Sequence, residues 1–584
     1  MRRLIPILAL LFASCVQPPA PAPVVADPES LRALPGGRIL GERDEHGAFA
    51  YRGLPYAEAP VGELRWRAPQ PASGWADTRE ALRSGSACIQ FGSRLGGLDL
   101  PPGEVGGSED CLFLDVYAPT ARASVPRPVL VWIHGGGNVV GHAGNYDGGY
   151  LAATQDVVVV NINYRLGPLG WFRHAALREE SSSPEEASGN FGVLDMIAAL
   201  EWVRDNIASF GGNPDNVTIF GESAGGRDVF ALLQSPSARG LFHRAISQSG
   251  GLRSSTLAEA ENFADAEEPG AARSSNEVLV ALLMSEKQLD RVEARESLSS
   301  MSSGEIAAFA RGVPADRLMQ AYAIENSGQL ARVPQMFPDG ALLPEGSGLE
   351  VLSRPDGHAG VPVLVGTNRD EDKLFLYADP ENSWQLLGLL PRLKDPDRFE
   401  SLAEHGSRMW KAAGADEPAV ALRVGGAPGV WVYRFDWDEE PTILGSDLSQ
   451  ILGASHGFEI PFVFGVFDLG AEANRLWTKE NEPGRRALSE KMISYWINFA
   501  RTGDPGQGVD GNLPMWSQAP SFMVFDTEQD GGLRMSDSTV REEEVLAAAR
   551  EDERLGRGDE RCEALARLHS RSNRHQDVAL PPGC

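Results

Sequence analysis

The sequence lacks long apolar runs within its body and is poor in cysteine and in positive charge. Its 584 residues contain 5 Cys, and 53 Lys and Arg stand against 81 Asp and Glu, a formal net charge of -28. A nucleic-acid-binding protein needs a basic face, so this balance argues against nucleic acid as a partner. No internal run is long enough to cross a membrane as a helix. Zinc-spaced Cys/His clusters, Walker loops and dinucleotide-binding glycine loops are absent too, so nothing indicates a metal or nucleotide.

The N-terminal segment predicts export rather than a folded element. Met1-Arg2-Arg3 is basic, and the apolar stretch from Leu4 to Ala13 is too short for a stable membrane anchor. The stretch ends at Ser14-Cys15, which resembles a bacterial lipobox. Residues 1–15 are therefore expected to be an export signal whose Cys15 is lipidated, tethering the protein to a membrane that faces the periplasm or the cell exterior. An ordinary cleaved signal is the alternative, because Phe12 stands where a lipobox usually has leucine.

Residues 16–30 are rich in Pro and Ala and are expected to form an extended linker after that cysteine. The remaining cysteines fit an exported protein. Four of them, Cys88, Cys111, Cys562 and Cys584, allow three disulfide connectivities, and the simplest gives two local loops.

The body of the chain, residues 31–540, alternates predicted strands with predicted helices. The apolar runs Val129–Ile133, Val157–Val160 and Val361–Val365 suit buried parallel strands, and 192–210 has helical periodicity. This alternation predicts an α/β fold with a doubly wound, mostly parallel sheet. Residues 257–352 read as a helical elaboration over the active site, and residues 541–584 as a peripheral helical tail closed by a Cys562–Cys584 disulfide.

A candidate nucleophile lies in Gly221-Glu222-Ser223-Ala224-Gly225, directly after the apolar run Val217–Phe220. The pattern Gly-x-Ser-x-Gly between a strand and a helix predicts a nucleophile elbow, which presents the serine hydroxyl at the top of a sheet. Only small neighbours tolerate the strained turn. Glu222, beside the serine, either stabilises a positively charged imidazole or is a buried carboxylate bonded to backbone.

Serine needs a base, and the base needs an orienting carboxylate. His456 stands in a loop of small residues, Gly453-Ala454-Ser455-His456-Gly457, that lets an imidazole reach a cleft. Glu371 follows the strand 361–365 and is the predicted acid, although spacing alone does not separate it from Asp370 or Asp372. The order Ser223, Glu371, His456 is that of an α/β hydrolase.

An oxyanion hole is predicted at His134-Gly135-Gly136-Gly137, directly after the strand 129–133. Glycines let backbone N–H groups approach a tetrahedral intermediate closely. We expect the N–H groups of Gly136, Gly137 and Ala224 to bind the oxyanion.

Together these motifs resemble the type-B carboxylesterase family, which includes cholinesterases and para-nitrobenzyl esterases. The resemblance runs from about Gly37 to Pro520. Beyond the elbow, the acid loop and the histidine, it rests on Gly53-Leu54-Pro55-Tyr56-Ala57, Ser108-Glu109-Asp110-Cys111-Leu112, Asn163-Tyr164-Arg165-Leu166-Gly167, Gln248-Ser249-Gly250 and His456-Gly457-Phe458-Glu459-Ile460. It implies a Ser-Glu-His triad, an acyl-enzyme intermediate, a small-molecule ester substrate and no cofactor. It also implies a Cys88–Cys111 disulfide and a structural pair of Arg65 with Glu109.

Departures from the family pattern leave some questions open. Asn138 replaces an aromatic residue after the glycines and is expected to make the pocket wall more polar. Asp372 replaces a common glycine, and it either adds negative charge near the triad or points to solvent. The same triad could cleave amides, thioesters or lactones, and some relatives are non-catalytic binding proteins. Because the histidine must be neutral to act as a base, we expect activity to rise with pH through roughly 6 to 7.

Overall fold

A mixed sheet of eleven strands runs through the protein. The computed structural model describes residues 24–93, 97–122, 124–323, 333–386, 390–468 and 473–573. From one edge of the sheet to the other, the strands are β20 (Arg534–Ser536), β19 (Phe522–Phe525), β16 (Val430–Phe435), β13 (Val363–Asn368), β12 (Arg244–Gln248), β11 (Gly212–Glu222), β9 (Arg127–Ile133), β10 (Val158–Ile162), β8 (Phe113–Ala118), β4 (Phe49–Pro55) and β3 (Glu42–Arg43).

The strands from β19 to β10 pair in parallel, and antiparallel strands flank them at both edges. The prediction of a mostly parallel α/β sheet is therefore confirmed. Parallel strands point their carboxyl ends to one edge of the sheet, where loops can gather functional side chains.

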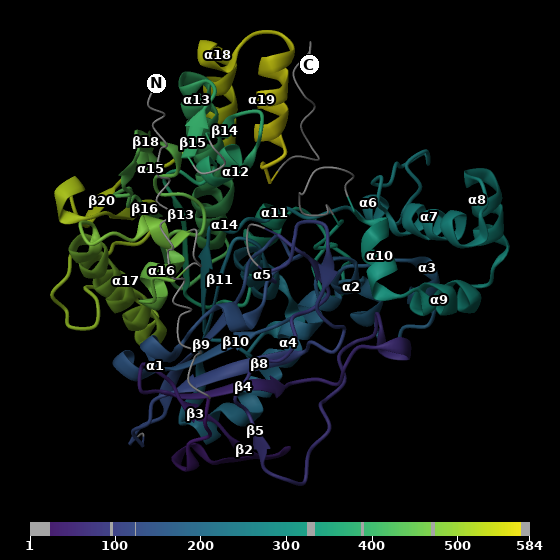
Figure 1. The fold of residues 1–584 in the computed structure, drawn as a ribbon, viewed down its shortest axis with the longest axis horizontal. Helices are drawn as coiled ribbons and strands as arrows, with labels where there is room; N and C mark the ends of the chain where they lie inside the picture. The colour runs from purple at the N-terminus through teal and green to yellow at the C-terminus, as the bar shows by residue number, and fades with distance from the viewer. Residues whose placement is uncertain are drawn as a thin grey trace, which may run out of the picture.

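Helices cover both faces of the sheet (Figure 1). Along β9, Val129, Val131 and Ile133 belong to one apolar core, while Leu130 and Trp132 belong to the other. This alternation is what period-two geometry requires of a strand buried on both faces. The first core contains α4 (Phe191–Asn206) and α5 (Ala224–Gln234), and the second contains α1 (Gly149–Gln155), α16 (Ile460–Phe464) and α17 (Glu482–Thr502).

The start of β11 is irregular. Its pairing with β9 shifts register between Gly212 and Val217, where the strand passes through Asn213-Pro214-Asp215. The irregularity lies at the start of the strand, so the end that carries the serine keeps its register.

The predicted helical elaboration is a lobe of short helices, teal in Figure 1 at the side of the sheet. Three of its helices begin with a capping box, which satisfies N-terminal N–H groups and fixes where each helix starts. Its helices are α6 (Leu257–Glu261), α7 (Ser275–Lys287), α8 (Arg291–Ser300), α9 (Ser303–Gly312) and α10 (Ala315–Ala321), with α11 (Gly348–Leu352) nearer the sheet. Within the described ranges, none of the helices is long and apolar enough to span a membrane.

Shorter elements complete the chain. They are a sheet of β1 (Arg32–Leu34), β2 (Gly37–Leu40) and β5 (Arg79–Glu80), the pairs β6 (Gln90–Phe91) with β7 (Val105–Gly106), β14 (Ser383–Leu386) with β15 (Leu390–Leu393) and β17 (Thr442–Ile443) with β18 (Ser446–Asp447), and the helices α2 (Gly167–Gly170), α3 (Ala175–Glu179) and α15 (Leu448–Ile451).

The C-terminal region forms two helices, α18 (Glu542–Glu551) and α19 (Asp559–His569). The chain turns between them at Gly556 and Gly558, both with positive φ, so the single helix expected from composition is broken there. The pair packs on α12 (Lys373–Ala378) and α13 (Pro396–Lys411) around a separate apolar cluster, beside α13 at one end of the molecule in Figure 1. A π-helical turn, Ala412–Asp416, joins α13 to α14 (Glu417–Val424).

Candidate active site

Ser223 lies at the turn from β11 to α5. Its backbone has φ 58° and ψ -117°, a conformation that non-glycine residues rarely adopt. A Cβ on Gly225 would lie 2.0 Å from the carbonyl oxygen of Ile133, and one on Gly221 would lie 2.6 Å from the backbone of Gly225. The turn therefore requires glycine on both sides of the serine. The side chain is partly exposed at the carboxyl end of the sheet.

The glycine loop after β9 lies against this turn. A Cβ on Gly135 would be 3.1 Å from the Cβ of Ser223, so the loop passes directly beside the serine. Gly136 and Gly137 have φ of 93° and 66°, and the carbonyl of Gly136 accepts hydrogen bonds from Val139 and Val140. Within the described part of the chain, the N–H groups of Gly136 and Gly137 donate no hydrogen bond. The first N–H groups of a helix, among them that of Ala224, have no partner within the helix.

Asn138 does not line a pocket wall as expected, because its side chain is fully buried beneath the glycine loop. Its amide donates to Asp228 Oδ1 at 3.0 Å, and its carbonyl accepts from the hydroxyl of Tyr164 at 3.0 Å. Tyr164 also donates to the carbonyl of His134. Burial raises the pKa of Asp228 to about 7, against the opposing hydrogen bond from Asn138. This polar network ties the glycine loop to α5, and a buried polar partner explains why no aromatic ring stands at position 138.

Glu371 and His456 meet at the ends of two neighbouring loops. The Oε2 atom of Glu371 lies 2.5 Å from Nδ1 of His456, and its Oε1 accepts the N–H of Asn368 at 2.8 Å. Glu371 is fully buried and His456 is 8% exposed. Both oxygens of the carboxylate are thus committed, which fixes the orientation of the imidazole.

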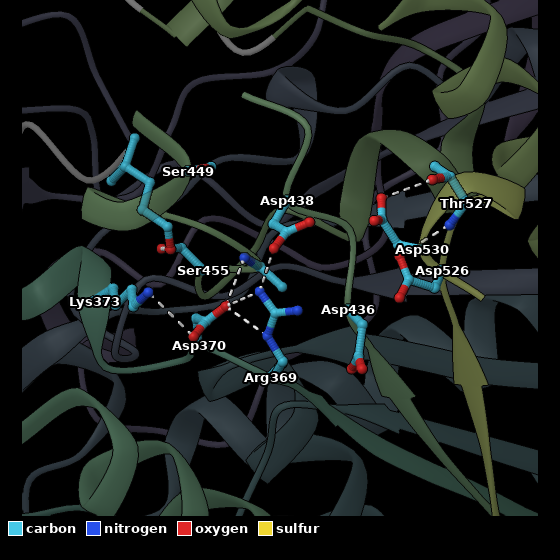
Figure 2. A network of polar contacts seen from close by, with 12 residues as sticks. Arg369, Asp370, Lys373, Asp436, Asp438, Ser449, Ser455, Asp526, Thr527 and Asp530 are labelled. Atoms are coloured by element: carbon cyan, nitrogen blue, oxygen red, sulfur yellow. Dashed lines mark hydrogen bonds and ion pairs between the residues drawn. The ribbon is translucent and has the colours of Figure 1, made fainter. Parts of the chain in front are cut away.

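Asp370, the first rival of Glu371, holds these two loops together (Figure 2). Its Oδ2 accepts hydrogen bonds from the side chain of Arg369 and from the N–H of Ala454, while its own N–H donates to the carbonyl of Ala454. Lys373 and Asp438 extend the ion-pair network outward. The carboxylate of Asp370 therefore holds the two loops together, whereas the next residue, Glu371, contacts the imidazole.

Asp372, the second rival, points neither to solvent nor to the imidazole. It is fully buried against α13, where a Cβ on Gly406 would lie 2.1 Å from its Oδ2. Its N–H donates to Ser407, and its Oδ1 forms ion pairs with Arg571 and Arg567. The extra carboxylate next to Glu371 is thus paired with two arginines of the C-terminal segment.

The other imidazole nitrogen, Nε2, lies 3.1 Å from Oε1 of Glu222. Nε2 has no hydrogen-bond partner within the described residues, Ser223 included. The Glu222 side chain likewise has no hydrogen bond to backbone within those residues. The geometry therefore fits a carboxylate that stabilises a positively charged imidazole better than one bonded to backbone. The sequence therefore brings Ser223, Glu222, Glu371 and His456 into one site, with Nε2 turned toward the carboxylate next to the serine.

The sequence analysis missed Glu459, a third carboxylate in this cluster. Its Oε2 accepts from the side chain of Asn368 at 2.6 Å, and its Oε1 accepts from Gln248 at 3.2 Å. Its only signal was position, three residues after His456 on the same loop. Two aromatic rings were also missed: Trp410 and Phe375 lie 4.4 Å and 5.2 Å from the imidazole, centroid to centroid.

These carboxylates change the proton affinity of the imidazole. Burial by itself would lower the pKa of His456, but the negative charges of Glu222 and Glu371 outweigh it and raise the pKa to about 9. Burial raises the pKa of Glu222 to about 8, against the attraction of His456. Groups this close titrate as a coupled pair. Because the pKa of His456 is raised, we expect activity to rise at a pH above the range of 6 to 7 that an ordinary histidine would give.

The supporting frame agrees with the family resemblance. Cys88 and Cys111 form a disulfide, which confirms that prediction. Arg65 donates two hydrogen bonds to Glu109, at 2.7 Å and 2.6 Å. The predicted lipidation at Cys15 and the partner Cys584 of the second disulfide lie outside the described residues. Within those residues one group has metal-ligand spacing, Glu45, His46 and Asp147, and it shares no residue with this site.

Comparisons with known proteins place this geometry in a family. The model of the carboxylesterase family matches residues 28–405 and 411–548. The chain is 38% identical over 508 residues to a para-nitrobenzyl esterase of Bacillus subtilis, covering 84% of this chain and 94% of that protein. It is 33% identical over 540 residues to human cocaine esterase, covering 85% and 88%. A solved para-nitrobenzyl esterase structure aligns with TM-score 0.64 and 31% identity, covering 87% of this chain and 97% of that chain. The chain therefore belongs to the carboxylesterase family and is a carboxylic-ester hydrolase.

Proposed function

We propose that Ser223, His456 and Glu371 form the catalytic triad through which this protein hydrolyses carboxylic esters by way of an acyl-enzyme. The observation that carries the proposal is the contact of 2.5 Å between Oε2 of Glu371 and Nδ1 of His456. It accompanies a serine that is held in a strained turn between β11 and α5. With Nδ1 committed to Glu371, Nε2 is the nitrogen left to take a proton.

In the first half of the reaction the oxygen of Ser223 bonds to the ester carbonyl carbon, and its proton passes to Nε2 of His456. The N–H groups of Gly136, Gly137 and Ala224 hold the oxyanion that forms. The intermediate then breaks its bond to the alcohol oxygen, which leaves with the proton from His456.

In the second half, water attacks the acyl carbon while His456 takes its proton. The bond to Ser223 breaks, the serine oxygen regains the proton, and the acid is released. Glu371 favours the positively charged imidazole in both halves. Glu222, 3.1 Å from Nε2, adds to this stabilisation.

The proposal extends to what the names of the relatives say of their substrates. Two relatives are named para-nitrobenzyl esterase and cocaine esterase, and another is named fumonisin B1 esterase. These names share a carboxylic ester and differ in the groups on either side of it. An ester with a good leaving group, such as a para-nitrophenyl ester, is the first substrate to try.

A hydrolysis screen over acyl chain length tests the proposal, with Ser223→Ala as the control. We expect the variant to lose at least about 10⁴-fold in kcat on every ester the wild type cleaves, because no other group forms the acyl-enzyme. Near-wild-type rates in Ser223→Ala would end the assignment. Matched amide and thioester substrates run alongside show which bond the site prefers.

The location of the protein is a separate proposal. We propose that the chain is exported and tethered through lipidated Cys15, on the strength of the basic start, the apolar stretch and the proline-rich segment that follows. Replacing Cys15 with serine should release the protein from membranes into the soluble fraction. Unchanged membrane recovery of that variant would contradict the tether.

A further inference from the structure

The segment after α18 reaches the active site, although it lies beyond the part of the chain that the family model matches. That match ends at residue 548, whereas α19 spans Asp559–His569 and Arg571 follows it. The segment is anchored on α13 by contacts of His405 and Ser401 with Asp552 and of Arg398 with the carbonyl of Leu555. Its last described residues are therefore held in place rather than free.

Beyond α19 the chain turns inward over the loop that follows β12. Asn573 accepts a hydrogen bond from the N–H of Leu252 at 3.1 Å and donates to the carbonyl of Ala413 at 2.7 Å. Its own N–H donates to Glu542, which is 2% exposed. One asparagine thus joins the C-terminal turn to the loop after β12 and to the π-helical turn.

Arg571, two residues earlier, contacts the two aromatic rings beside His456 and the carboxylate of Asp372, the residue after Glu371. Its guanidinium lies over Trp410, 4.7 Å from the ring centre, and over Phe375 at 5.5 Å. The same guanidinium is ion-paired with Asp372 and is only 17% exposed. Trp410 is fixed in turn by a hydrogen bond from its indole N–H to the carbonyl of Ser249. Planar arginine suits this double contact, which lysine reproduces only in charge.

We propose that Arg571 is a positioning residue for His456: it neutralises Asp372 next to Glu371 and presses Trp410 and Phe375 against the imidazole. The proposal rests on the proposed function, because it takes His456 to be the base. It also makes the C-terminal segment a working part of the active site rather than a peripheral appendage.

The charges of Arg571 and Asp372 predict the direction in which each substitution should shift the pH profile. Arg571 and Asp372 together add little net charge beside Glu371, and the charge of Arg571 acts on Glu371 as well as on Asp372. Removing Arg571 leaves Asp372 paired with Arg567 alone, and removing Asp372 leaves both arginines without their carboxylate partner. The other charged groups facing this cluster are Glu222 from β11, Glu459 from the His456 loop, Arg567 from α19, and Asp370 and Lys373 from the acid loop and α12.

The experiment is a charge cycle on the full-length enzyme, read as the pH midpoint of kcat/KM. Arg571→Met leaves Asp372 less compensated, so the midpoint should rise by roughly half a unit. Asp372→Asn leaves the cation in excess, and the midpoint should fall by a similar amount. The double variant should return close to the wild-type midpoint, while its kcat stays low by about tenfold because the guanidinium no longer packs on the rings.

Two further variants separate positioning from folding. Arg571→Lys keeps the charge and should restore the midpoint while recovering kcat only in part. Arg561→Met removes a cation of α19 whose hydrogen bonds, among the described residues, go to the backbone carbonyls of Arg550, Asp552 and Gly556. It should therefore leave the pH profile unchanged even where it lowers the melting temperature.

Shifts of opposite sign that cancel in the double variant support the proposal. Midpoints equal to that of the wild type in both single variants, or moved in the same direction, overturn it. So does an effect of Arg571→Met confined to the KM of anionic esters, which would make Arg571 a substrate contact instead. Ser223→Ala distinguishes this failure from that of the proposed function: it stays inactive if only the role of Arg571 is wrong.

Discussion

The two halves of the active site are built by different means. Around Ser223, backbone conformation shapes the site: a serine with positive φ, glycines that exclude any Cβ, and N–H groups that donate no hydrogen bond to the described residues. Around His456, buried charge does it, with carboxylates from separate strand ends and a guanidinium from the C-terminal segment. The first half consists of two short motifs in which a Cβ on Gly135, Gly221 or Gly225 would clash with backbone atoms. The second half gathers charged side chains from segments farther apart in the sequence, from Glu222 to Arg571.

Among changes that leave Ser223 in place, the largest effect should come from the charged half. Glu371→Gln keeps the size of the side chain but loses the charge that fixes the imidazole tautomer, and we expect kcat to fall by about 10³- to 10⁴-fold. The measurement is steady-state hydrolysis of a para-nitrophenyl ester with protein matched by melting temperature.

Glu404→Gln is the matched control, because Glu404 is a half-exposed carboxylate on α13 whose partners are Arg408 and Arg554. It should keep wild-type activity. If Glu371→Gln also keeps wild-type activity, Glu371 is not the acid that orients the imidazole, and the comparison between the two halves is wrong.

The backbone half can be broken by a single methyl group. Gly136 has φ 93°, and a Cβ there would lie 2.2 Å from the carbonyl oxygen of Val140. Gly136→Ala should displace the loop and cost about 10²- to 10³-fold in kcat, the scale of one lost oxyanion donor. The comparison is Gly47→Ala, which imposes the same left-handed strain at φ 88° with nothing within 4 Å.

Gly47 lies on the turn between β3 and β4, so its variant should show a loss of stability with little change in kcat. Equal losses of kcat in the two variants would mean that strain alone, and not the position of the loop, explains the effect.

The smallest expected effect is a shift of the pH midpoint of activity, and it tests the charged half of the site. The base must be neutral to act, and the carboxylate of Glu222 raises the pKa of His456, so activity should rise with pH at a midpoint above 7. Glu222→Gln removes that charge and should move the midpoint down, toward the ordinary histidine value of about 6.5. Rates from pH 5 to 10 measure it, and an unchanged or higher midpoint would contradict the assigned role of Glu222.

What could be predicted from the sequence follows the same division. Ser223 and the glycines of the 135–137 loop could be located because each stands in a short motif that directly follows an apolar run. The choice between Asp370, Glu371 and Asp372 could not be made, since three adjacent carboxylates at a strand end have the same spacing. Their partners decide it, and those partners, Ala454, His456 and Arg571, come from later in the chain.

Long-range packing also explains the remaining misses. Asn138 was expected in the pocket wall because the family pattern usually has an aromatic residue there, and its buried partner Asp228 comes from the neighbouring helix α5. Glu459 and Trp410 lie on segments whose approach to His456 depends on the whole sheet. The mostly parallel core, by contrast, was predictable as a class, because predicted strands and helices alternate along the chain.

Covalent labelling tests the central claim most directly. A phosphonate ester with a para-nitrophenyl leaving group should release one para-nitrophenolate per chain and abolish activity in step, because attack by the nucleophile leaves the phosphonyl group on its oxygen. Peptide mass spectrometry should place the adduct on Ser223, and Ser223→Ala should neither release para-nitrophenolate nor gain mass. An adduct on another residue, or equal labelling of Ser223→Ala, would contradict the account.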